Sequence, residues 1–181
     1  MTRRRAATWA LVSVALIAAF FGVRALRYDL DTVSLGSRAP DFSAATLDAA
    51  PQSRTLASYA GEVVLLNIWA TWCGPCRVEM PSIQTLHEAY APQGLKVVAI
   101  SVDPAGKQEQ IRAFADSLGL TFEILYDPSG AIQRAYRTTG VPETIVIGRD
   151  GMVRKRVLGA IHWDSQANRA LVEQLLAKPA S

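Results

Sequence analysis

Residues 62–76 read EVVLLNIWATWCGPC, and this stretch decides the fold. Its first part, 62–70, is an apolar run rich in branched side chains, which is typical of a strand buried on both faces of a sheet. Apolar and aromatic side chains then recur near helical spacing, at Val78, Ile83, Leu86 and Tyr90. The stretch therefore predicts a central strand that leads directly into a helix, with Cys73 and Cys76 in the first turn of that helix.

Strand and helix patterns alternate on either side of this stretch. An Asp-Gly pair at 150–151 lies between two apolar runs and indicates a hairpin. The further expected elements are a short hairpin from 41–47 and 54–56, strands at 95–102, 122–126, 144–147 and 152–158, and helices at 111–118, 131–136 and 164–177. The order predicts the α/β fold class, with a mixed sheet covered by helices on both faces.

The composition suits one folded domain and excludes a nucleic-acid-binding protein. The chain has 181 residues, of which 50% are hydrophobic and 19% are charged, so it can bury a core. The formal net charge of +3 comes from the N-terminus, because five of the 19 Lys and Arg residues precede the first acidic residue, Asp29. The rest of the chain is mildly acidic, and we expect no nucleic-acid partner.

The N-terminal residues predict a membrane anchor. Residues 6–23 carry no charge and lie between Arg5 and Arg24, and a helix of that length is about 27 Å long, enough to cross a hydrocarbon core. We expect 1–5 in the cytoplasm, 6–23 as a transmembrane signal anchor, 24–38 as a linker and 39–181 as a domain outside the cytoplasm. A signal peptide cleaved after Ala25 is the alternative.

The two cysteines predict thiol-disulfide chemistry. Cys73 is placed where the backbone N–H groups and the dipole at the start of a helix stabilise a thiolate, so it is the expected nucleophile. Cys76 lies one helical turn further on, within reach for a Cys73–Cys76 disulfide, and is the expected resolving thiol. Pro75 lies at an early helical position, where a missing N–H costs nothing, and stiffens the ring that the disulfide closes.

Two cysteines at this spacing have three other known uses. A structural disulfide would close too small a loop to stabilise the fold much by chain entropy. A zinc site would need further ligands, and His87 and His162 lack the spacing of a zinc finger, so we predict no metal. Binding of Cu(I) by the two thiolates stays open as an alternative, because thiolate ligands favour that ion.

Residues 69–76 (WATWCGPC), followed by Arg77 and by Glu-Met-Pro at 79–81, resemble the thioredoxin superfamily and, within it, the membrane-anchored TlpA/ResA-like branch. Residues 140–144 (GVPET) match the family's cis-proline loop. The resemblance covers about 36–178. It implies a thioredoxin-like fold with an N-terminal β-hairpin extension and a central helix-strand insertion at 104–127, preceded by one transmembrane helix.

The same resemblance implies a function and a place in the cell. Proteins of this branch are extracytoplasmic thiol-disulfide oxidoreductases, often linked to cytochrome c or copper-oxidase assembly. The implied location is a bacterial inner membrane, crossed once, with the soluble domain in the periplasm or otherwise outside the cytoplasm. The implied partners are client protein disulfides and a DsbD-like membrane electron donor.

The motifs also assign roles to other residues. A cis bond at Pro142 would let Val141 present its backbone to a client chain, and Trp72, Gly74 and Pro75 would form the rest of the client-binding surface. Thioredoxin has a buried aspartate six residues before its nucleophilic cysteine, where this chain has Asn67. An amide cannot accept a proton from Cys76, so we expect Glu143 to act as the proton acceptor.

The predicted reaction is reduction of a client disulfide by Cys73 and Cys76, without a cofactor. The Gly-Pro pair between the cysteines is that of thioredoxin, which is strongly reducing at about −270 mV, so reduction is favoured over oxidation. Two alternatives are a Cu(I)-binding chaperone and a peroxidase of the peroxiredoxin type.

Overall fold

The computed structural model of the chain describes residue 9 and residues 12–22 and 33–179, in two units, 1–32 and 33–181. In the first unit, residues 12–22 are helical. Among the described residues, no helix has the length and apolar character needed to cross a membrane. The anchor predicted at 6–23 falls partly outside the described residues, and residues 1–5 and 24–32 lie wholly outside them.

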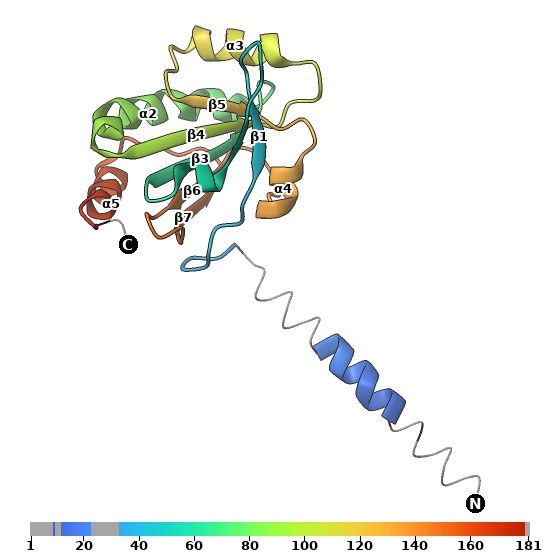
Figure 1. Cartoon of the computed structure of the whole chain (residues 1–181). Helices are drawn as coiled ribbons and strands as arrows, with labels where there is room; N and C mark the ends of the chain where they lie inside the picture. Colours follow the sequence, from blue (N-terminus) through green and yellow to red (C-terminus); the bar gives the residue numbers. More distant parts are fainter. Residues whose placement is uncertain (1–8, 10–11, 23–32, 180–181) are drawn as a thin grey trace, which may run out of the picture. The chain divides into compact units, whose positions relative to one another are not determined.

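The second unit is built on a seven-stranded sheet with the strand order β2-β1-β5-β4-β3-β6-β7 (Figure 1). Its strands are β1 (Ser43–Thr46), β2 (Ser53–Thr55), β3 (Val63–Trp69), β4 (Leu95–Ser101), β5 (Glu123–Tyr126), β6 (Glu143–Ile147) and β7 (Val153–Leu158). Its α-helices are α2 (Gly74–Tyr90), α3 (Gln108–Ser117), α4 (Ala131–Tyr136) and α5 (Gln166–Leu176), with short 3-10 helices at Leu56–Tyr59 and Ala91–Gln93.

The central strand is the one expected from the apolar run. Every residue of β3 is buried, and β3 pairs parallel to β4 and antiparallel to β6. The hairpin predicted at the start of the domain and the helix and strand predicted within 104–127 are present. The hairpin of β1 and β2 joins the sheet by pairing antiparallel to β5, and α3 and β5 are the helix and strand.

Alternation along β3 divides the core into two layers. Val63, Leu65 and Trp69 pack on the face covered by α2, α3 and α5, whereas Val64, Leu66 and Ile68 pack on the face covered by α4 and the N-terminal segment. Asn67 has the same parity as Leu65 and Trp69. Its side chain therefore lies on the α2 face, among mostly apolar neighbours.

The folded unit begins earlier than the predicted boundary at residue 39. Residues 33–38 do not form a free linker, because Gly36 N–H donates to Val153 O at 2.8 Å and Val153 N–H donates to Ser37 O at 2.8 Å. Val33 is itself buried. The exposed edge of β7 offers unpaired backbone groups, and the segment satisfies some of them.

The functional loops meet at one edge of the sheet. β3, β4 and β5 are parallel, so their carboxyl ends lie together, and Cys73 follows the first of them. β6 runs antiparallel to β3 and therefore starts at this edge, immediately after Pro142. The topology brings the two sequence motifs together, although some seventy residues separate them in the chain.

Candidate active site

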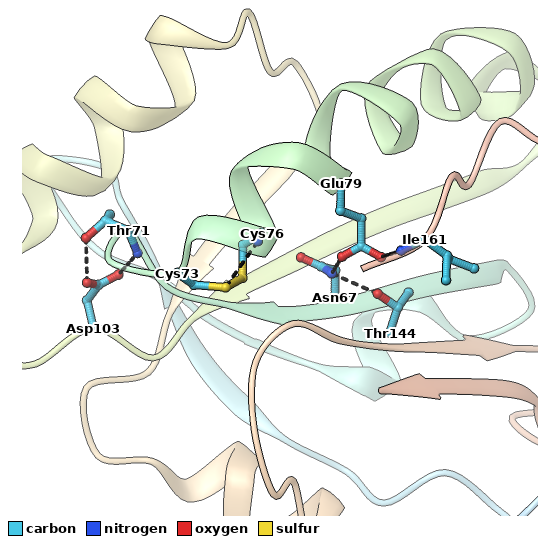
Figure 2. The surroundings of a disulfide bond; sticks show 8 residues. All are labelled: Asn67, Thr71, Cys73, Cys76, Glu79, Asp103, Thr144 and Ile161. Atoms are coloured by element: carbon cyan, nitrogen blue, oxygen red, sulfur yellow. Dashed lines mark hydrogen bonds between the residues drawn. A yellow bond between two sulfur atoms is a disulfide. The ribbon is translucent and has the colours of Figure 1, made fainter. Parts of the chain in front are cut away.

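Cys73 and Cys76 form a disulfide at the start of α2, with an S–S distance of 2.04 Å (Figure 2). Cys73 is the N-cap residue, and its sulfur accepts a hydrogen bond from the Cys76 backbone N–H at 3.1 Å. Both cysteines are buried. Once the disulfide is reduced, the same N–H and the positive end of the helix would stabilise a Cys73 thiolate, as the position in the sequence predicts.

A buried aspartate holds the loop between β3 and the disulfide. Asp103, which follows β4, accepts hydrogen bonds from the Thr71 backbone N–H at 2.9 Å and from the Thr71 hydroxyl at 2.7 Å (Figure 2). Ser101 donates a third hydrogen bond, at 2.8 Å, to the same carboxylate. These contacts fix the backbone two residues before Cys73. The sequence patterns did not reveal this contribution.

The cis-proline loop has the geometry expected of it. The Val141–Pro142 peptide bond is cis, and Pro142 O accepts a hydrogen bond from Gly159 N–H at 2.8 Å. Val141 is half-buried, and Trp72 is 67% exposed beside the first cysteine.

The short turn of the disulfide itself is open to a partner chain. Gly74 and Pro75 are the first two residues of α2, both exposed, and a Cβ added at Gly74 would meet no atom within 4 Å. This side of the turn has room for an approaching polypeptide. The client-binding roles of these residues stay predictions.

Glu143 lies on the wrong side of the sheet for the role we expected. Along β6 the side chains alternate, and Val146 packs in the α2 layer, whereas Ile145 and Ile147 pack in the α4 layer. Glu143 shares the parity of Ile145, and its buried carboxylate pairs with Arg156. This position does not suit a proton acceptor for Cys76, because the sheet lies between the carboxylate and the disulfide.

A different carboxylate, Glu79, lies on the side of the disulfide. It follows Cys76 by one helical turn on α2, so the two side chains share a face, and it is buried. Its Oε1 accepts from the Trp163 indole N–H at 2.6 Å and from Ile161 N–H at 3.5 Å. A charged residue on the buried face of an amphipathic helix was the signal in the sequence that could have identified it.

Burial raises the pKa of Glu79 above its ordinary value, because the charged form is poorly solvated there. Hydrogen bonds from Trp163, Ile161 and Asn67 favour the carboxylate and oppose this shift in part. The balance makes Glu79 a carboxyl group that is able to take up a proton more readily than an exposed glutamate.

Asn67 connects Glu79 to β6. Its Nδ2 donates to Glu79 Oε2 at 3.3 Å and to Thr144 Oγ1 at 2.8 Å (Figure 2). Register supports this contact, since Asn67 and Thr144 are directly paired across β3 and β6. The buried polar groups beside the disulfide thus form one connected set of Asn67, Glu79, Thr144 and Trp163.

This fold and this cysteine pair define the class of protein. The model of the AhpC/TSA family matches residues 35–156, and the chain belongs to this thioredoxin-like family. It is 43% identical over 127 residues to the thioredoxin-like protein YneN of Bacillus subtilis, a match that covers 70% of this chain and 72% of that protein. It is 36% identical over 129 residues to the thiol-disulfide oxidoreductase ResA of Geobacillus thermodenitrificans, covering 71% and 72% respectively.

Solved structures agree with these relatives. A thiol:disulfide interchange protein of the thioredoxin family from Chlorobium tepidum superposes with a TM-score of 0.66 at 26% identity, over 80% of this chain and 99% of the other. The resemblance to the thioredoxin superfamily is thereby confirmed. With a disulfide at the start of α2 and relatives of this kind, the chain is a thiol-disulfide oxidoreductase.

Proposed function

We propose that this protein reduces disulfide bonds in client proteins outside the cytoplasm. The observation that carries the proposal is the Cys73–Cys76 disulfide at the N-terminus of α2, with a backbone N–H already directed at the Cys73 sulfur. The Gly-Pro pair between the cysteines supports the direction, because thioredoxin has the same pair and is reducing.

The reaction begins with the reduced enzyme. The Cys73 thiolate attacks one sulfur of a client disulfide, and the other client sulfur leaves as a thiolate. An extended client chain would pair with the backbone at Val141 while it is attacked, and exposed Trp72 would contact its apolar side chains. The product of this step is a mixed disulfide between Cys73 and the client.

Cys76 then resolves the mixed disulfide. Its thiol must first lose a proton, and we assign the acceptor role to Glu79, which is one helical turn away and whose pKa is raised by burial. The Cys76 thiolate attacks the Cys73 sulfur, and the second client sulfur leaves as a thiolate. The client gains two electrons and becomes a dithiol, and the enzyme is left as the disulfide seen in the structure.

The cellular setting is part of the same proposal. A reductase outside the cytoplasm must be reduced again by electrons from inside, so we propose a DsbD-like membrane protein as the donor. Residues 6–23 would anchor the chain in a bacterial inner membrane, and the folded unit would face the periplasm. The uncharged run at 6–23 and the arginines that flank it support the anchor. A role in cytochrome c or copper-oxidase assembly fits this setting.

The test is capture of clients by a resolving-cysteine variant. The full-length Cys76→Ser variant is expressed with its N-terminal segment, and its Cys73 is kept reduced. It is expected to accumulate mixed disulfides between Cys73 and client proteins. A thiol reductant then releases the clients, which are identified by mass. Cys73→Ser is the matched control and should capture none through that sulfur. The wild-type chain should also reduce insulin disulfides.

Two results would contradict the proposal. Rapid consumption of hydrogen peroxide without reduction of protein disulfides would favour the peroxidase alternative. Tight binding of Cu(I) by the reduced chain, again without disulfide reduction, would favour the copper chaperone.

A further inference from the structure

The side-chain amide of Asn67 is satisfied at one end and unsatisfied at the other. Nδ2 donates to Glu79 and to Thr144, whereas Oδ1 is buried and accepts no hydrogen bond. In Figure 2 this oxygen is drawn on the side of the amide that faces the disulfide. A buried carbonyl oxygen without a donor is unfavourable, so its presence beside a reactive site requires an explanation.

The redox state of the protein explains the unpaired Asn67 Oδ1. In the disulfide form, the Cys76 sulfur carries no hydrogen and cannot donate. After reduction, Cys76 is a thiol with one S–H donor. The unpaired Oδ1 therefore matches a donor that exists only in the reduced protein.

An amide in this position suits both proton distributions of the resolving step. When Cys76 is a thiol and Glu79 a carboxylate, Oδ1 accepts from S–H and Nδ2 donates to Glu79, which is the orientation seen here. After the proton has moved, Cys76 is a thiolate that needs a donor and Glu79 an acid that needs an acceptor. A half-turn of the amide supplies both, and Thr144 can donate its hydroxyl hydrogen to Oδ1 in the rotated state.

We propose that Asn67 is a positioning residue for the resolving step, and that its amide rotates by half a turn as a proton passes from the Cys76 thiol to the Glu79 carboxylate. The proposal rests on the proposed function, since it takes Glu79 as the acceptor. The amide itself neither gains nor loses a proton. An aspartate at position 67 could not replace it, because an ionised carboxylate cannot donate to Glu79 or to a thiolate.

The other groups around Glu79 do not supply this pairing. Glu79 is faced by Cys76 on its own helix, by Asn67 on β3, and by Ile161 and Trp163 after β7. The Lys155 ammonium lies 5.5 Å from the Trp163 ring centroid and donates to Asn168 instead. In the proposed resolving step, the proton therefore passes between the Cys76 thiol and the Glu79 carboxylate.

The experiment measures the alkylation rate of Cys76 against pH in the full-length, reduced chain. A Cys73→Ser background leaves Cys76 as the one thiol of the sequence. Loss of a hydrogen bond to a charged group should make Asn67→Leu react about tenfold more slowly near neutral pH, with its profile displaced to higher pH. Gln84→Leu is the matched control, because Gln84 is also a buried amide but bonds to Thr121 and Glu88. Its profile should overlay the parent.

Coupling and rotation have separate readouts. Asn67→Leu should slow the alkylation of Cys76 clearly less in a Glu79→Gln background than in the parent, because the two side chains act as one unit. In the reduced parent, the side-chain amide resonances of Asn67 should titrate with the same midpoint as Cys76 alkylation, and those of Gln84 should not.

The outcomes separate the two proposals. A shifted profile for Glu79→Gln with an unshifted one for Asn67→Leu overturns the role of Asn67 and leaves Glu79 as acceptor. An unshifted profile for Glu79→Gln removes the acceptor and, with it, the rotation. If Asn67→Leu does not fold, as judged by circular dichroism, Asn67→Ala takes its place. It removes the amide without adding a charge or a base, is expected to shift the profile upward, and overturns the proposal if it does not.

Discussion

Arg156→Met should destabilise the fold strongly, because it would leave a buried carboxylate without its partner. Glu143 is 2% exposed and pairs with Arg156, whose side chain is 26% exposed. The same guanidinium donates to Val33 O at 2.8 Å and to Tyr136 O at 2.9 Å. It therefore joins the N-terminal segment and the end of α4 to the residue that follows Pro142.

The expected magnitude follows from that burial. Removing one partner of a buried pair costs about 3–5 kcal/mol, and the partial exposure of Arg156 favours the lower end, near 3 kcal/mol. For a domain of this size, 1 kcal/mol changes the melting temperature by about 2–4 °C, so we expect a fall of roughly 6–12 °C. Chemical and thermal unfolding at neutral pH, followed by circular dichroism, would measure both values.

Arg154→Met is the control on the same strand. Arg154 pairs with Asp150, and the two side chains are 31% and 37% exposed, so its removal should cost about 0–1 kcal/mol. Combining Arg156→Met with Glu143→Gln should recover much of the loss, because no buried charge is left unpaired. Equal and small effects of Arg156→Met and Arg154→Met would refute the reasoning.

Three further outcomes are expected. The pKa of Glu79 is raised above its ordinary 4.5 in the folded state. Its contribution to stability is therefore fully present below about pH 4.5 and is lost as pH rises through the folded-state pKa. Unfolding free energies measured against pH should show this loss in the reduced wild type and not in Glu79→Gln. Asp103→Asn should lower stability by about 1–3 kcal/mol, because one oxygen that accepts from Thr71 or Ser101 becomes a donor, and insulin reduction should slow with it; an unchanged melting temperature would contradict this. Trp72→Ala should lower kcat/KM for protein disulfides, because the exposed ring would no longer contact the client. Reactivity toward a small disulfide and thermal stability should stay nearly unchanged, because the ring is 67% exposed. A large loss of stability would instead indicate that Trp72 belongs to the core.

The regular elements of the fold could be predicted because each has a local signature. The apolar run at 62–70, the helical spacing after Cys73 and the Asp-Gly turn at 150–151 each reflect a period or a backbone requirement that acts within a few residues. The cysteine pair and Pro142 were predictable for the same reason, since each belongs to a short motif.

The buried polar residues of the site could not be assigned so simply. Whether Glu143 faces the disulfide depends on the parity of β6 relative to β3, and that parity is set by register between strands far apart in sequence. Helical spacing is enough to place Glu79 on the buried face of α2, but its role depends on the contacts with Trp163 and Ile161, which reach it only after the chain has folded. Register and long-range burial are tertiary properties, and local patterns do not encode them.

The segment at 33–38 also affects how the protein meets other polypeptides. It bonds along part of β7, and the opposite border of the sheet ends in β2, which has 3 residues, one of them the half-buried Arg54. A short or occupied border offers little template for an incoming strand, which protects natural sheets from edge-to-edge aggregation. A thiol-disulfide enzyme repeatedly encounters extended, incompletely folded chains. With one border this short and the start of the other occupied, such chains would be held mainly by their sulfur chemistry and released when it is complete, instead of accumulating on the sheet.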